Sequence, residues 1–151
     1  MSSATPPSPP SGPPPGPRNN WVRVGLAAAA RLTVESQETT GAVVVRAIGE
    51  AELPPETDLF QQSLARLCAG RPALMVIDLT ALRFASSLAL GAMTATRRSL
   101  AGHGGRVVLV GLTRPVRDVL QRTGLAALFP VFPTVDAALG RGTAPPPSAP
   151  R

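Results

Sequence analysis

Two short apolar runs constrain the fold of this chain more than any other feature. Ala73–Ile77 and Val107–Val110 contain no polar residue, and each leads directly into a residue typical of turns. Apolar runs of this length are typical of strands that are buried on both faces. Such strands occur in parallel sheets that helices cover, so the sequence predicts an α/β fold.

Helical patterns stand between and after these runs. Pro54-Pro55 opens a predicted helix that Gly70 ends, and its apolar residues recur every three to four positions. These residues are Phe60, Leu64, Leu67 and Cys68. Three further helices are predicted over about 86–101, 115–123 and 134–139, from their apolar periodicity and from capping residues at their ends.

The remaining strands complete a small sheet. Leu32–Ser36 alternates between apolar and polar residues and predicts an edge strand. Ala42–Ile48 is β-branched and predicts a central strand that ends at Gly49, whereas 79–85 is a short connection and 129–132 a short last strand. The elements together predict a mixed, largely parallel sheet of about four to five strands covered by about four helices.

Proline-rich segments stand at both ends of the chain. Residues 1–31 and 141–151 have little to bury, so we expect a disordered lead and a disordered tail around one domain at 32–140. The run at 24–30 imitates the centre of a signal peptide, but a proline-rich stretch precedes it. No apolar run has the length of a membrane span, so we expect a cytoplasmic protein without membrane insertion.

The positive charge of the chain lies mainly outside the predicted domain. The net charge is +6, yet residues 32–140 hold ten arginines against nine acidic residues, which leaves +1. Aromatic residues amount to 3% of the chain. The near-neutral charge and the scarcity of aromatic residues therefore give the domain neither the net positive charge nor the stacking platform that favour direct nucleic-acid binding.

The sequence offers little support for catalysis, a metal site or a cofactor. Cys68 and His103 are each the single residue of their kind, so an internal disulfide and a cysteine-rich metal site are excluded. The glycines of Gly102–Gly105 close a predicted helix rather than opening one, which is the reverse of a phosphate-binding loop. We expect no enzyme.

Two hydrolase arrangements were weighed in particular. A helix between Ser87 and His103 would separate them by about 24 Å, far beyond hydrogen-bond reach. A carboxylate pair among Glu50, Glu52 and Asp78 stays open, although these residues have no distinctive spacing.

The paired serines Ser86 and Ser87 carry the clearest functional signal. They stand where a helix begins, shortly after a buried strand that ends in Asp78. A hydroxyl there can cap the free N–H groups of the helix. The same position also suits a phosphate, which would add about −1.5 to −2 charges to an exposed surface. Both roles, cap and phosphorylation site, remain open at this point.

The succession of short motifs resembles the STAS domain of anti-sigma-factor antagonists. The resemblance covers nearly the whole predicted domain in the family's order. The matching segments are Gly49–Glu52, Val76–Leu79, Ala85–Ala89, Gly104–Val110, Arg117–Leu120, Thr123–Leu125, Leu128–Val131 and Asp136–Leu139.

The resemblance implies a binding module that docks an anti-sigma factor and so releases a sigma factor for transcription. In this family the anti-sigma factor is often a serine kinase, which would phosphorylate Ser87, and a serine phosphatase would reverse the modification. Ser86 would support the site. The implied docking residues are Glu50, Glu52, Ser86, Ser87 and Leu88.

Two positions depart from the family pattern. Ala85 replaces an acidic residue before the serines, and Leu88 replaces the glycine that follows them. Either the domain keeps the switch and binds a divergent partner, or it has lost phosphoregulation and binds constitutively. A scaffold or ligand-sensing STAS domain without a phospho-switch is the alternative class. Burial of the two serines would contradict the switch interpretation.

Overall fold

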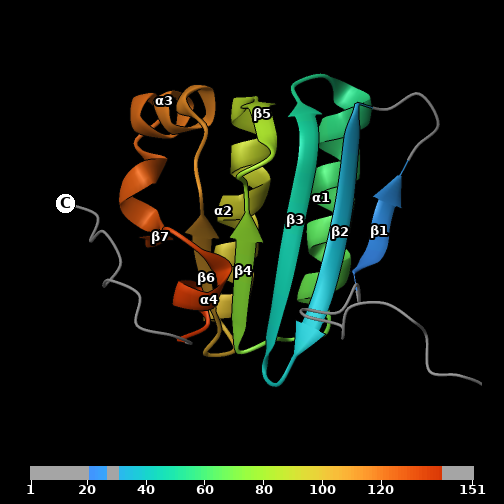
Figure 1. Cartoon of the computed structure of the whole chain (residues 1–151), viewed down its shortest axis with the longest axis vertical. Helices are drawn as coiled ribbons and strands as arrows, with labels where there is room; N and C mark the ends of the chain where they lie inside the picture. Colours follow the sequence, from blue (N-terminus) through green and yellow to red (C-terminus); the bar gives the residue numbers. More distant parts are fainter. Residues whose placement is uncertain (1–20, 27–30, 141–151) are drawn as a thin grey trace, which may run out of the picture.

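The structure is a computed structural model that describes residues 21–26 and 31–140, and for 24–26 the backbone alone (Figure 1). Its strands are β1 (Val22–Leu26), β2 (Leu32–Thr39), β3 (Ala42–Ala51), β4 (Leu74–Asp78), β5 (Leu82–Ala85), β6 (Arg106–Val110) and β7 (Val131–Phe132). Its helices are α1 (Pro54–Cys68), α2 (Ser87–Ala101), α3 (Arg114–Arg122) and α4 (Val135–Ala138), with a 3-10 turn η1 (Leu125–Leu128).

The strands form one mixed sheet in the order β1-β2-β3-β4-β6-β7, with β5 also paired to β3. β2 runs antiparallel to both β1 and β3, and the other pairings are parallel. The predicted α/β class and the largely parallel sheet are confirmed. The described part of the chain has seven strands, more than the four to five expected.

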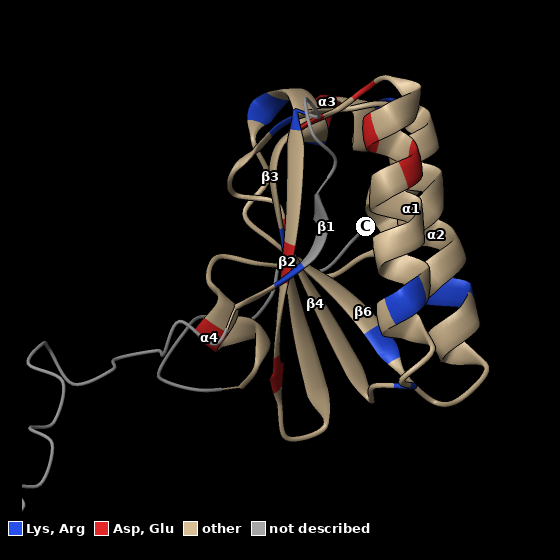
Figure 2. Ribbon diagram, turned by 90° about the vertical axis from the view of Figure 1, so that its right-hand side faces the viewer, with Lys and Arg blue, Asp and Glu red and all other residues tan. Residues whose placement is uncertain are grey.

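Helices lie on both sides of the sheet. Figure 2 shows α1 and α2 packed along one face, with α4 against the other. The side chains of β4 and β6 alternate between the two layers, with Met75 and Leu109 in the larger core and Val76 and Val108 in the smaller one. The two apolar runs are therefore buried on both faces, as predicted.

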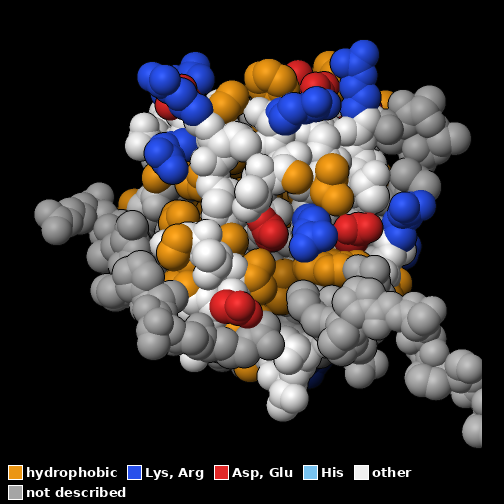
Figure 3. Space-filling model, viewed as in Figure 1, with side chains coloured by type: hydrophobic (Ala, Val, Ile, Leu, Met, Phe, Trp, Pro, Cys, Tyr) orange, Lys and Arg blue, Asp and Glu red, His pale blue; other side chains and the backbone are white. Residues whose placement is uncertain are grey.

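The face that carries α4 also holds a row of charged side chains. Glu35, Arg46 and Asp78 occupy directly neighbouring positions on β2, β3 and β4. Arg46 lies 3.8 Å from each carboxylate, and its guanidinium stacks 4.0 Å from the centre of the Trp21 ring. Basic and acidic side chains alternate across the middle of this face in Figure 3, among hydrophobic ones.

Two predictions near the N-terminus are wrong. Leu32–Ser36 is not an edge strand, because β2 lies between β1 and β3. β1 falls within the segment expected to be a disordered lead, so the folded domain begins before Leu32. Because β1 is short and contains Gly25, its own pattern gives little sign of a strand, and its pairing with β2 defines it. The rest of the predicted lead and tail, at 1–20, 27–30 and 141–151, lies outside the described residues.

A further correction concerns the segment 79–85, which we expected to be a connection. It contains β5, and β3 runs beyond the predicted end at Gly49 as far as Ala51. β3 has ten residues and β4 has five, so β4 leaves the last residues of β3 unpaired. β5 supplies the missing hydrogen-bond partners there.

Candidate functional site

The pairing of β3 with β5 positions the two serines. Ala85 lies opposite Ala51, and the N–H of Ser86 donates to the Ala51 carbonyl over 2.9 Å. The Ser86 hydroxyl then accepts the N–H of Ala89 over 3.3 Å, which makes Ser86 the N-cap of α2. Ser86 is partly buried, and its side chain therefore serves the helix.

Ser87 is placed differently from its neighbour. It is the first residue of α2, it is exposed, and its hydroxyl bonds to none of the described residues. Leu88 follows with 70% of its surface exposed. The two serines were expected to face outward as a pair, but only Ser87 is exposed, at a helix terminus where the dipole favours negative charge.

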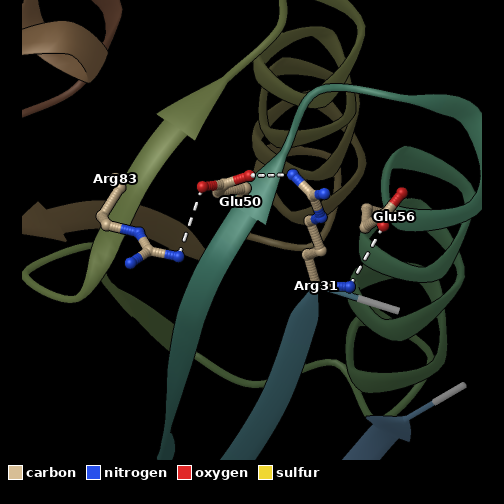
Figure 4. A network of polar contacts seen from close by, with 4 residues as sticks. All are labelled: Arg31, Glu50, Glu56 and Arg83. Carbon is tan, nitrogen blue, oxygen red and sulfur yellow. Dashed lines mark hydrogen bonds and ion pairs between the residues drawn. The ribbon is translucent and has the colours of Figure 1, made fainter. Parts of the chain in front are cut away.

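Glu50 lies between Arg31 and Arg83 in a charged cluster (Figure 4), and its strand partner Phe84 precedes the serines by two residues. Its carboxylate approaches Arg31 at 3.5 Å and Arg83 at 3.2 Å. Arg31 is also held through its backbone, because its N–H donates to Glu56 Oε1 over 3.1 Å and its carbonyl accepts the N–H of Glu50 over 2.9 Å. Glu50 therefore orients two exposed arginines at this edge of the sheet.

Gly49 makes that arrangement possible. Its φ of +116° is a conformation that residues with a side chain rarely adopt, and a β-carbon there would collide with the carbonyl oxygen of Arg31. The glycine of the Gly49–Glu52 motif thus permits a close approach of two backbones at the end of β3.

Exposed hydrophobic side chains collect around the serines. Leu53, Phe84 and Leu88 are 66%, 41% and 70% exposed, and they are three of the four large exposed hydrophobic residues in the described part of the chain. Each lies within two residues of the hydrogen bond between Ser86 and Ala51. A cluster of this kind at the rim of a soluble domain is typical of an interaction site.

Leu53 and Phe84 were missed by the sequence analysis, together with Arg31 and Arg83. Leu53 stands before Pro54, outside the apolar face of α1, and this off-pattern position is the signal that would have found it. Glu52, which was predicted, is exposed and lines a groove of about 400 Å³ between β5 and α3.

The other polar residues considered from sequence do not converge. His103 lies beyond the far end of α2, away from Ser87. Asp78 accepts the N–H of Thr80 over 3.0 Å and so shapes the turn after β4. Asp78 lies opposite Arg46, which precedes Glu50 by four residues on β3. The backbone positions of Asp78 and Glu50 are therefore separated by about 13 Å along the strand direction, a wider spacing than the carboxyl groups of a glycosidase pair have. Among the described residues there is no group of three metal-binding side chains.

The sequence of residues 33–138 matches the STAS domain family. The chain belongs to that family. This STAS domain is 32% identical over 117 residues to a Mycobacterium tuberculosis protein whose name describes it as a candidate anti-anti-sigma factor, with 76% of this chain and 78% of that protein covered.

Solved structures agree with this assignment. The STAS domain resembles a crystal structure of an anti-sigma factor antagonist from Mycobacterium paratuberculosis, with a TM-score of 0.66, 31% identity and coverage of 76% of this chain and 97% of the other. It also shares its fold with the anti-sigma factor antagonist SpoIIAA of Bacillus in the unphosphorylated form, at a TM-score of 0.60 and 21% identity over 73% of this chain and 99% of that one. The described residues include no helix long and apolar enough to cross a bilayer.

Proposed function

We propose that this STAS domain is an anti-sigma factor antagonist that docks an anti-sigma factor through the surface around the start of α2. This docking surface comprises Glu50, Glu52, Leu53, Arg83, Phe84, Ser86, Ser87 and Leu88. The observation that carries the proposal is the exposure of three large hydrophobic side chains around a solvent-facing serine. Release of a sigma factor in the cytoplasm would follow from docking.

The composition of the docking surface supports a protein partner. Exposed leucine and phenylalanine side chains provide the apolar centre that a stable interface buries. Glu50 holds Arg31 and Arg83 around that centre, so the partner meets charges that are already oriented. Oriented charges at the rim of an interface favour the correct partner and speed its association.

Phosphorylation at Ser87 is the proposed means of regulation. The exposed hydroxyl at the helix start is accessible to a kinase, and a phosphate would be favoured there by the helix dipole. About −1.5 to −2 charges beside Leu88, Phe84 and Glu50 would oppose burial of the docking surface. The folded domain would keep its stability because Ser86, and not Ser87, caps α2.

The two departures from the family pattern fit this proposal. Leu88, which replaces a glycine, is 70% exposed, and its bulk therefore adds to the apolar centre of the docking surface. Ala85, which replaces an acidic residue, is 5% exposed and lies opposite Ala51. A divergent partner that relies less on that carboxylate is consistent with both changes.

The test is to recover the partner of the full chain from native lysate of its host and to measure its affinity for purified variants. The Ser87→Glu substitution should weaken binding on the order of tenfold and leave the melting temperature within about 2 °C. Gln62→Glu adds the same charge at an exposed position of α1. It is the matched control and should bind the partner with wild-type affinity.

The same measurement separates the proposal from its alternative. An anti-sigma factor with kinase activity that modifies Ser87, together with a phosphatase that restores binding, supports the switch. A partner without kinase activity, together with unchanged partner affinity in the Ser87→Glu variant, would instead indicate a scaffold or ligand-sensing STAS domain.

A further inference from the structure

A groove runs between α1 and α2 on the outer side of the helical layer. Its volume is about 500 Å³, and it lies toward the carboxyl ends of the two helices, away from the docking surface. We call it the helix groove. It is lined by Gln61, Ala65, Cys68, Ala69 and Arg71 on the α1 side and by Ala92, Ala95, Thr96, Ser99 and His103 on the α2 side.

The floor of the helix groove is made of small residues. The groove is lined by Ala65 of α1, by Ala69 directly after it, and by Ala92 and Ala95 of α2, and all of these except Ala92 are exposed. From Gln61 to Ala69 the α1 side extends for about 12 Å along the helix. A straight channel between two parallel helices, with alanine along its floor, allows the close approach of a third helix.

Basic residues predominate around the helix groove, although the exposed Glu38 at the end of β2 lines a neighbouring groove together with Arg71. No acidic residue occurs from Leu59 to Ile77 or from Leu79 to Arg117. Figure 2 shows the basic residues on the carboxyl halves of α1 and α2 and at the start of β6, and acidic residues near the start of α1. The basic residues are Arg66, Arg71, Arg97, Arg98 and Arg106. Three of them, Arg71, Arg98 and Arg106, are exposed and form no ion pair with a described residue.

Arg71 stands in a conformation that favours another residue. Its φ is +53°, which makes it the single non-glycine residue with positive φ in the described part of the chain. Glycine or asparagine occupies this position after a helix at lower cost. An arginine that lines the groove from this less favourable conformation suggests a use for its side chain.

We propose that the helix groove binds an acidic amphipathic helix of a protein partner, at a site separate from the docking surface. The basic surroundings attract the acidic flanks of such a helix, and the alanine floor receives its apolar face. The terminal segments of this chain are unsuitable occupants, because 1–20 and 141–151 contain no acidic residue and three arginines. A second copy of the chain would bring the same net charge of +6.

The two sites occupy different parts of α2. Ser87 and Ala95 lie eight residues apart on α2, which corresponds to about 12 Å along the helix axis. This inference does not depend on the docking of an anti-sigma factor. The Ser87→Glu variant should therefore bind an acidic helix as well as the wild-type chain does.

The probe is a synthetic helical peptide of about 16 residues with a leucine stripe flanked by glutamates, and its control carries lysine in place of each glutamate. Titration into the isotope-labelled full chain should perturb NMR signals of residues 61–71 and 92–103 and leave 84–88 unchanged. The lysine peptide should bind on the order of tenfold more weakly. Equal binding of both peptides, or perturbation at 84–88 instead, would overturn the proposal.

Variants of the chain make the test specific. Arg71→Gly should weaken the acidic peptide on the order of fivefold, with a melting temperature that is unchanged or raised because glycine accepts the positive φ. Arg117→Ala on exposed α3 is the control and should change neither value. Wild-type affinity in the Arg71→Gly variant would contradict the proposal. So would perturbation of the same signals by inorganic phosphate at the concentration of the peptide, since that would indicate a site for small anions.

Discussion

The two ends of α2 differ in how charge and apolar surface are combined. At its start, large hydrophobic side chains are exposed and the nearby arginines Arg31 and Arg83 are paired with Glu50. Toward its end, the exposed apolar surface consists of alanine, and the exposed arginines Arg71 and Arg98 form no ion pair with a described residue.

This difference separates two modes of recognition within one small domain. A surface of balanced charge and bulky apolar groups gains affinity from burial, so its binding depends weakly on salt. A basic groove with a shallow floor binds an acidic partner mainly through charge, so its affinity falls as the salt concentration rises.

The largest effect is expected from adding a methyl group to Gly49, which lies in β3 and pairs with β5 before the start of α2, compared with Gly104, which follows the end of α2. Gly49→Ala should destabilise the fold by roughly 3 kcal/mol, because the β-carbon meets the Arg31 carbonyl in addition to the strain of positive φ. Gly104→Ala, at φ +78° with open space around it, should cost about 1 kcal/mol. Urea unfolding measures both. Equal losses would show that the close approach at Gly49 contributes nothing.

The next effect concerns the apolar centre of the docking surface. Leu88→Ala should weaken binding of the recovered anti-sigma factor by about 2 kcal/mol, since a central interface leucine is truncated. Val22→Ala is the control, because Val22 is 63% exposed but lies on β1, far along the sheet from the serines. Calorimetric titration gives both affinities. A loss of the same size in the two variants would remove Leu88 from the interface.

Salt should distinguish the two surfaces directly. Raising NaCl from about 50 to about 300 mM should weaken the acidic peptide at the helix groove on the order of tenfold. Binding at the docking surface should change by less than about threefold, because its arginines are already paired. A steeper salt dependence at the docking surface than at the groove would reverse the comparison.

The smallest effect separates the two serines. Ser86→Ala should lower stability by about 1 kcal/mol, because the N-cap hydrogen bond to Ala89 is lost. Ser87→Ala should stay within about 0.5 kcal/mol, since its hydroxyl bonds to none of the described residues. Thermal unfolding of the two variants tests the assignment. It fails if Ser87→Ala proves the more damaging substitution.

Much of the fold was accessible from local pattern alone. Apolar periodicity predicts β4, β6 and the long helices α1 and α2. The spacing of apolar residues along each segment shows whether one or both of its faces are buried. β5 was not accessible in this way. Its burial pattern has two exposed residues between two buried ones, which is not the alternation of a typical strand. It pairs with β3 because β3 extends beyond the end of β4.

The residues of the candidate site also fall into those that the local sequence indicates and those that only the strand pairing brings together. Ser86 and Ser87 are recognised from their place at the start of a helix, whereas Leu88, Glu50 and Glu52 were assigned through the family resemblance. Arg31 and Phe84 reach the site through the pairing of β3 with its neighbours, which the local sequence does not display. Residues that a fold gathers from separate strands require the register of the sheet before they can be named.

The hydrogen bond between Ser86 and Ala51 has a mechanical consequence. Ala51 ends the strand that leads into α1, and Ser86 caps α2, so one short link joins the first turns of both helices. A protein that grips the beginning of α2 thereby also restrains the beginning of α1.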